Sequence, residues 1–205
     1  MKNKENLVLT IYLNQEEKRM KDMKKMILAA LFLAMGMILP FFTGQIPAIG
    51  SRLLPMHIPV LLCGFVCGWQ YGLTVGIILP IFRSLIFTMP KMMPTAVAMA
   101  FELAVYGVVA GILYAKLPKK KLSVYISLIT AMFAGRVIWG VVSIPLYGIT
   151  GGSFSTAMFI AGAFTNAIPG IILQIVAIPA IIIALTQIGV LKNERENAYR
   201  MLSNR

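Results

Sequence analysis

The sequence predicts an all-α integral membrane protein with six transmembrane helices arranged in one domain. Hydrophobic residues make up 59% of the 205 residues and charged residues only 13%, which is about half of the usual charged share in soluble proteins. The mean hydropathy is +0.82. Six apolar runs, separated by glycine, proline or charged residues, follow one another along the chain. Lipid is therefore the expected solvent of most of this protein.

The first three predicted spans are residues 24–42, 55–68 and 70–88. The second span is short, because it begins at Pro55 and ends at Gly68. A helix of this length needs a tilt, a thinner bilayer or a partly buried course.

The last three predicted spans are residues 94–115, 122–148 and 157–189. The last run is longer than a bilayer requires. Pro169 and Pro179 lie inside it and predict a kink or a broken helix.

The distribution of positive charge predicts that both termini are cytoplasmic. Seven of the 19 lysines and arginines lie in the first 25 residues, and further clusters occupy residues 116–121 and the C-terminal tail. By the positive-inside rule these segments face the cytoplasm. We expect a basic cytoplasmic segment (1–23), a six-helix membrane domain (24–190) and a cytoplasmic tail (191–205) in the plasma membrane of a bacterium.

The net charge of +12 does not indicate nucleic-acid binding. The basic clusters lie beside apolar spans, where membrane orientation and anionic lipid headgroups explain them. Membrane lipid is thus an expected partner and nucleic acid is not.

Four polar side chains on four different spans are predicted to lie at a similar depth. Glu102 and Asn166 should lie about 12 and 15 Å below the outer face, at about 1.5 Å per helical residue. Arg83 and Arg136 should reach that level from inside, after about 20 Å of a hydrocarbon core of about 30 Å. Charged groups at this depth usually face a bundle interior or mark a substrate path. The pattern therefore predicts a small-molecule carrier with its site in the outer half of the membrane.

Helical spacing adds neighbours to these candidates. Tyr106 shares a helix face with Glu102, and Ser143 shares one with Arg136, because residues three, four or seven apart lie on one face. His57 and Lys91 lie near the predicted outer ends of their segments. The predicted substrate-binding residues are Arg83, Glu102, Tyr106, Arg136, Ser143, Asn166, Lys91 and His57.

Each candidate also has a purely structural interpretation. Glu102 and Arg136 would neutralise each other as a buried pair, and Asn166 would form a hydrogen bond between helices. Arg83 would extend towards the outer headgroups. Lys91 would be solvated in a loop, and His57 would be a capping or packing residue.

Small residues predict where helices pack closely. Without a hydrophobic force between helices in lipid, small faces allow their backbones to approach. Ala30 and Ala34 form such a face on the first span. This face would pack either against another helix of the chain or against a partner protein. The glycines with this spacing are Gly64, Gly68, Gly72, Gly76, Gly107 and Gly111.

Enzyme and metal motifs do not occur in the sequence. The chain has no Gly-x-x-x-x-Gly-Lys-Ser/Thr loop, so another subunit must supply any ATPase. Cys63 and Cys67 are four residues apart but have no suitably spaced histidine or acid, which favours two buried thiols over a zinc or haem site. We therefore expect no catalytic residue, no bound metal and no cofactor.

Two segments resemble a known family. The run from Leu54 through His57 to Pro80 is similar to the second and third helices of substrate-binding S components of energy-coupling factor (ECF) vitamin transporters. The run from Met93 to Gly107 resembles their fourth helix. Six spans, a length near 200 residues and cytoplasmic termini agree with this resemblance, which extends over roughly residues 22–190.

The resemblance implies a fold and a set of partners. S components bind a vitamin or related micronutrient from outside and associate with a transmembrane coupling subunit and two ATP-binding-cassette ATPases. Their first helix carries an Ala-x-x-x-Ala face for the coupling subunit, which Ala30 and Ala34 match here.

Charge gives a clue to the substrate. If Glu102 offsets either Arg83 or Arg136, one buried positive charge remains, and arginine binds carboxylates with two parallel hydrogen bonds. Pantothenate then fits best, with lipoate, niacin and folate as alternatives. If Glu102 instead faces the ligand without a partner, an amine or a donor-rich heterocycle such as a queuosine precursor fits better. Riboflavin is a further candidate.

Two functions of other classes remain open. An intramembrane enzyme would need a cluster of acids or histidines, whereas the chain has one histidine and one glutamate within its spans. A stand-alone secondary carrier commonly has internal repeats, and none is detected. Dependence of uptake on a separate ATPase distinguishes the S component from both.

Overall fold

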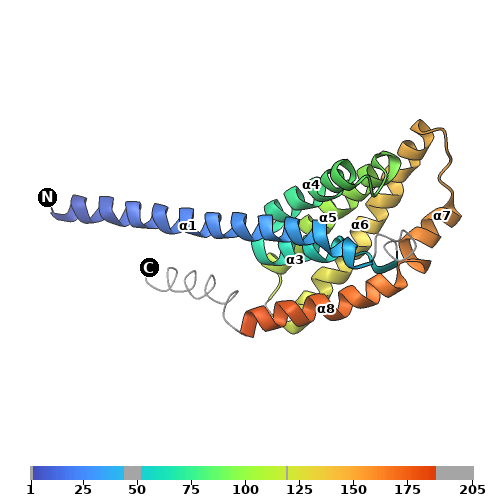
Figure 1. Cartoon of the computed structure of the whole chain (residues 1–205). Coiled ribbons are helices and arrows are strands. Elements are labelled where there is room, and N and C mark those ends of the chain that lie inside the picture. Colours follow the sequence, from blue (N-terminus) through green and yellow to red (C-terminus); the bar gives the residue numbers. More distant parts are fainter. Residues whose placement is uncertain (1, 44–51, 119, 188–205) are drawn as a thin grey trace.

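The computed structural model describes residues 2–43, 52–118 and 120–187, which contain helices and no strand (Figure 1). In chain order the elements are α1 (Lys2–Ile38), η1 (Leu39–Thr43), α3 (His57–Cys67), α4 (Trp69–Phe87), η2 (Met92–Ala96), α5 (Val97–Lys116), α6 (Lys121–Ile149), α7 (Thr156–Ile160), η3 (Ala161–Thr165) and α8 (Ile168–Gln187). The predicted all-helical class is confirmed for this part of the chain. The predicted cytoplasmic tail, residues 191–205, lies outside the described residues.

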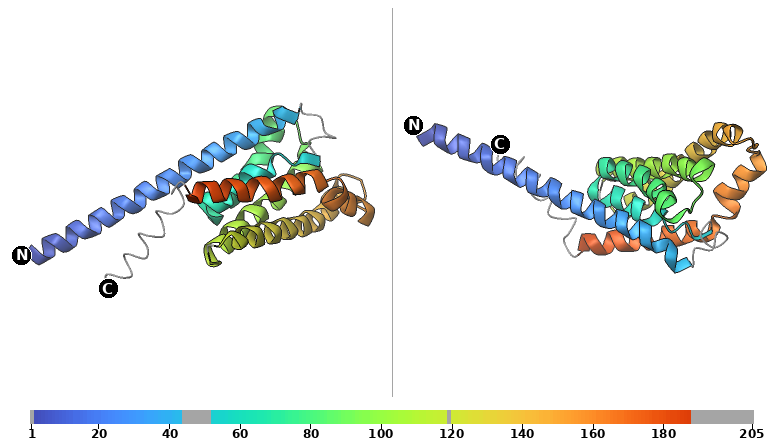
Figure 2. Two further views of the ribbon diagram at one scale, coloured as in Figure 1. Left: turned by 90° about the horizontal axis from the view of Figure 1, so that it is seen from below. Right: turned by 45° about the horizontal axis from the view of Figure 1, so that its top comes forward.

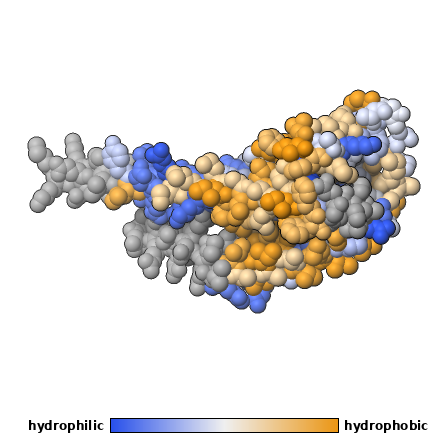
Figure 3. Space-filling view, viewed as in Figure 1, coloured by the Kyte–Doolittle hydropathy of each residue, from blue (hydrophilic) through white to orange (hydrophobic). Residues whose placement is uncertain are grey.

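Five helical segments are long and apolar enough to cross a membrane. These segments are Tyr12–Phe42, Trp69–Phe87, Met92–Lys116, Lys121–Ile149 and Thr156–Gln187. Hydrophobic residues cover much of the bundle in Figure 3, and hydrophilic residues gather where α1 leaves it. The fold is thus that of an all-α membrane protein. The six-span topology and the cytoplasmic termini stay predictions.

The predicted second span forms a short helix at the centre of the bundle. The 11 residues of α3 extend about 16 Å, about half of the hydrocarbon thickness. Nine of its residues are buried, and it packs against α1, α4, α5 and α8. Because neighbouring helices surround α3, its sequence is apolar on every side.

The first helix is longer than the predicted span. The apolar run predicts a helix over 24–42, but α1 already begins at Lys2. Its C-terminal half packs on α3 and α4, where Phe32 is buried and Gly36 lies against the side chain of Leu79. Its N-terminal half projects beyond the bundle in every view (Figures 1 and 2). The predicted basic segment is therefore part of one continuous helix.

Glycines bring α3, α4 and α5 into backbone contact. A Cβ added to Gly72 would lie 2.8 Å from the Cα of Gly107, and one added to Gly64 would lie 2.5 Å from the Gly107 carbonyl oxygen. A Cβ on Gly111 would lie 2.5 Å from the backbone nitrogen of Trp69. These distances are too short for any side chain, so the predicted packing role is confirmed for these glycines. Gly68 is different, because an added Cβ would meet nothing within 4 Å and its φ of +98° serves the turn between α3 and α4.

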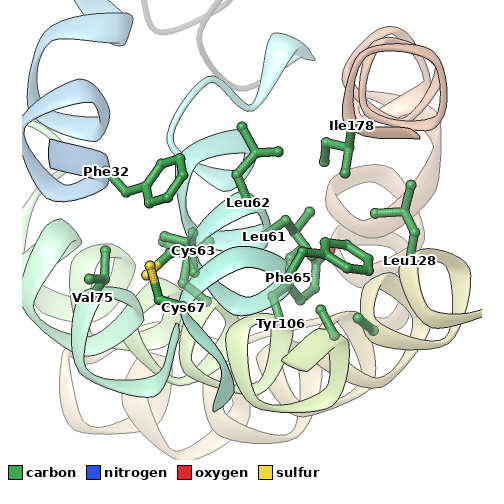
Figure 4. Close-up of a cluster of buried hydrophobic side chains, with 14 of the residues drawn as sticks. Phe32, Leu61, Leu62, Cys63, Phe65, Cys67, Val75, Tyr106, Leu128 and Ile178 are labelled. Carbon is green, nitrogen blue, oxygen red and sulfur yellow. The ribbon is translucent and has the colours of Figure 1, made fainter. Parts of the chain in front are cut away.

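The hydrophobic core lies between α3, α5, α6 and α8. Leu61, Tyr106, Leu128 and Ile178 come from these four helices and are fully buried (Figure 4). Cys63 is buried in the same cluster, as predicted. This core lies directly inward of the polar residues described below.

The last predicted span, 157–189, is divided into separate segments. A turn at residues 166–167 separates α7 and η3 from α8, which confirms the predicted break. Pro169 is the second residue of α8, a position where its missing N–H breaks no helical hydrogen bond. Pro179 lies inside α8. None of the α7 side chains is buried, so this segment lies on the surface of the bundle.

Candidate functional site

A buried polar cluster joins α3, α5 and α6. Glu102 of α5 is 1% exposed. Its Oε1 lies 2.9 Å from Nη1 of Arg136 on α6 and 3.3 Å from Nε2 of His57 on α3. The ring of Tyr106 meets that of His57 edge to face, with centroids 5.3 Å apart. The structure thus brings together four predicted site residues from three helices.

Local sequence features place these four side chains. Glu102 and Tyr106 are one helical turn apart and lie on the same face of α5. Gly135 has no side chain to obstruct the ring of Tyr106, which occupies the place where a Cβ would lie. The backbone N–H of His57 donates to the carbonyl of Leu54 at 3.1 Å, and this turn begins α3 at the level of the cluster.

Burial requires that the charge of Glu102 be compensated. A carboxylate without a cation would be very costly in this environment, so the contact with Arg136 makes the burial of both groups possible. His57 adds a second nitrogen on the same carboxylate oxygen. The predicted ion pair between Glu102 and Arg136 is therefore present, and it includes the histidine.

Arg136 is only partly satisfied by this contact. Its Nε and Nη2 are buried, and neither has a hydrogen-bond partner among the described residues. These two nitrogens lie on one edge of the planar guanidinium and point their hydrogens in parallel. Such an edge matches the two oxygens of a carboxylate. The cluster therefore offers a buried donor pair to an anion.

Two further buried polar side chains extend this region along α6 and α8. Ser143 and Gln174 are fully buried, and within residues 52–118 and 120–187 neither side chain has a hydrogen-bond partner. Ser143 is a predicted site residue on the same helix as Arg136. Gln174 was missed, although a glutamine within an apolar run is the same signal that singled out Asn166.

Arg83 is held elsewhere in the bundle. Its Nη1 donates to the carbonyl oxygen of Met37 at 2.5 Å. Its guanidinium carbon lies 5.2 Å from the ring centre of Phe41 and 5.3 Å from that of Phe87. These contacts tie α4 to the end of α1 and explain the burial of Arg83 without a ligand.

Asn166 and Lys91 do not join the buried cluster. Asn166 is exposed at the turn between η3 and α8. Lys91 is exposed just before η2. Their participation in ligand binding stays a prediction.

The comparison with protein families identifies the chain. The model of the family "ECF transporter, substrate-specific component" matches residues 24–182. The chain belongs to this family. The protein is therefore a substrate-binding membrane subunit of a transporter, with a small-molecule substrate and ECF module partners. Neither the curated proteins nor the solved structures that were searched gave a match.

The predicted coupling face of this S component is open on its surface. Ala30 and Ala34 are exposed on α1, and the adjacent Ile27 and Leu31 are 63% and 54% exposed. Ala29 and Phe32 on the other side of the helix are buried. The small residues thus do not pack within the described chain.

No metal centre is found in the described part of this S component. Groups of three or more histidine, cysteine, aspartate or glutamate side chains do not occur among those residues. His57 and Glu102 meet, but the third member of their cluster is Arg136, a cation that cannot ligate a metal. The described residues thus do not form a metal site at this cluster.

Proposed function

We propose that this S component captures a carboxylate-bearing vitamin from outside the cell for ATP-driven uptake, and that pantothenate is its substrate. The coupling subunit and two ATP-binding-cassette ATPases would act with it in a bacterial plasma membrane. In this proposal the six spans place both termini in the cytoplasm, so that the polar cluster lies in the outer half of the membrane.

The observation that carries this proposal is the geometry of Arg136. One of its nitrogens neutralises Glu102, and the edge formed by Nε and Nη2 has no hydrogen-bond partner in the described residues. Buried donors are normally satisfied. A ligand carboxylate would supply the missing acceptors.

Pantothenate fits this environment better than the other candidates. It carries one carboxylate, one amide and two hydroxyl groups, and Tyr106 and His57 of the cluster and Ser143 on α6 are further polar side chains for these groups. Folate, niacin and lipoate also carry a carboxylate and are the alternatives for the same edge. A queuosine precursor or riboflavin would depend instead on Glu102, which already contacts two nitrogen groups.

Thermal unfolding of the detergent-purified protein tests the proposal. The panel is pantothenate, folate, riboflavin, niacin, lipoate and a queuosine precursor. A ligand at 100 times its dissociation constant stabilises the folded state by about 2.7 kcal/mol. We expect pantothenate to raise the unfolding temperature most. A response to a compound without a carboxylate would contradict the proposed site chemistry.

Uptake measurements distinguish the transport mechanism. Cells that express this S component with a coupling subunit and ATPases should accumulate labelled pantothenate, whereas cells with inactive ATPases should not. Accumulation without the ATPases would indicate a secondary carrier. Conversion of the compound by the purified protein alone would indicate an intramembrane enzyme.

A further inference from the structure

Gln174 is the buried polar residue that the ion-pair cluster leaves unexplained. It lies in the middle of α8 between apolar residues, and its exposed fraction is 0%. Both its Oε1 and its Nε2 lack a hydrogen-bond partner within the described part of the chain. A fully buried amide with neither end satisfied is rare and costly in native proteins. The residue therefore needs a partner that the described residues do not provide.

The register of α8 places Gln174 beside the polar cluster. One turn inward, Ile178 packs in the core with Leu61 and Leu128 (Figure 4). One turn outward, a Cβ added to Gly170 would lie 2.6 Å from the carbonyl oxygen of Arg52. Gln174 thus lies between the core and the chain segment that leads into α3.

The cluster residues of the other helices lie outward of the same core, His57 at the level of Gln174 and Arg136 one turn further. His57 lies one turn outward of Leu61 on α3, and Arg136 lies two turns outward of Leu128 on α6. Because Ile178 packs against the same core, Gln174 faces the same interior as His57 and Arg136. Four helices therefore contribute polar groups to one region.

The chemistry of the glutamine amide defines its complement. The side chain carries an acceptor oxygen and a donor NH₂ group side by side. A primary amide or a lactam edge, with N–H and C=O side by side, satisfies both at once. A secondary amide, whose N–H and C=O point in opposite directions, satisfies one end, and a neighbouring hydroxyl group must satisfy the other. A carboxylate satisfies only the donor, and an apolar tail satisfies neither.

We infer that Gln174 is a specificity-determining residue that binds an amide group of the substrate, while Arg136 binds the carboxylate of the same molecule. This inference rests on the proposed function and narrows it to carboxylates that also carry an amide. Pantothenate and folate belong to this class. Nicotinate and lipoate carry the carboxylate without the amide and should bind weakly.

The variant Gln174→Met tests this inference, because methionine has a similar size and no polar atom to satisfy. The matched control is Ser127→Ala on α6. Like Gln174, Ser127 is a fully buried polar side chain without a hydrogen-bond partner in the described residues. It lies nine positions before Arg136 on the same helix, away from the proposed ligand. For each purified protein, the unfolding temperature is measured without ligand, and the dissociation constants are measured for pantothenate, folate, nicotinate and lipoate.

The expected result separates ligand recognition from folding. Gln174→Met should unfold at or above the wild-type temperature, because it removes an unsatisfied buried group. It should bind pantothenate at least tenfold more weakly and change nicotinate and lipoate affinity little. Ser127→Ala should bind every compound like the wild type.

Other outcomes overturn the inference. A lower unfolding temperature for ligand-free Gln174→Met would show a structural role, and unchanged pantothenate affinity would exclude the amide contact. If no compound stabilises the wild type, the proposed ligand class fails on its own. Binding of pantothenate to the wild type with unchanged affinity in Gln174→Met, by contrast, overturns the inference and leaves the proposed function standing.

Discussion

Arg136 reaches Glu102 through a single nitrogen, with Nη1 at 2.9 Å from Oε1. A pair that served only to neutralise two buried charges would be best arranged with two parallel hydrogen bonds. Here the carboxylate oxygen is shared with His57, and the other edge of the guanidinium has no hydrogen-bond partner among the described residues. In the proposed function, one nitrogen of this arginine compensates the charge of Glu102 and the other edge binds the ligand.

The double variant Glu102→Leu/Arg136→Met distinguishes these two tasks. Arg136→Met alone leaves a buried carboxylate and should destabilise the protein by about 3–5 kcal/mol. Removing both charges should restore most of this stability. We expect pantothenate binding to be lost in both variants, as measured by ligand-induced shifts in unfolding temperature.

The relation between stability and binding decides this test. A double variant that recovers stability without binding supports the ligand role of Arg136. If it binds pantothenate like the wild type, Glu102 and Arg136 are only a structural pair.

The contact between Glu102 and Arg136 could be predicted because charges are rare in apolar spans and their depths can be counted. The involvement of His57 was less predictable, because the short helix α3 had to be placed at the centre of the bundle first. The depth count places Asn166 in the interior, but depth alone does not say which side of a helix faces the bundle. Asn166 lies exposed at the turn of residues 166–167, and Gln174 is the buried amide.

Most spans could be predicted within a few residues, because hydropathy responds directly to lipid. The expected span 122–148 is α6, and 70–88 is α4, and each differs by one residue at both ends. The start of α1 at Lys2 could not be read from hydropathy, because its first turns are polar and lie beyond the bundle. Proline predicted the break in the last span, but not the orientation of the segments around it.

Gly107→Ala should destabilise the protein strongly. The added methyl group would collide with the backbone of Gly72, which cannot move aside like a flexible side chain. Overpacking of this kind typically costs about 1–3 kcal/mol. Gly148→Ala is the control, because no atom lies within 4 Å of its added Cβ. Thermal unfolding in detergent should show a lower transition for Gly107→Ala and a nearly unchanged one for Gly148→Ala.

Arg83→Met should affect stability more than ligand affinity. The substitution removes the hydrogen bond to the Met37 carbonyl and the two ring contacts of the guanidinium. Hydrogen bonds from charged groups contribute about 1.5–3 kcal/mol. We expect a lower unfolding temperature with pantothenate affinity largely retained. The opposite pattern, lost affinity at unchanged stability, would support the ligand role predicted from the sequence.

Ala30→Trp should abolish uptake and leave ligand binding intact. Ala30 lies on the exposed face of α1, on a helix separate from the cluster around Glu102. A large side chain there would prevent the close backbone approach that small residues allow between helices in lipid. Uptake of labelled pantothenate in cells and binding to the purified variant are the two measurements.

The control for Ala30→Trp is Ile129→Trp on α6, where the native side chain is 53% exposed and the change adds bulk on another surface. This variant should retain both uptake and binding. Loss of binding in Ala30→Trp would indicate damage to the fold, and full uptake would place the coupling surface elsewhere. Intact binding together with lost uptake would assign the Ala30 and Ala34 face to the coupling subunit. In that case the substrate is captured, and the step that fails is the later one, in which the coupling subunit takes part.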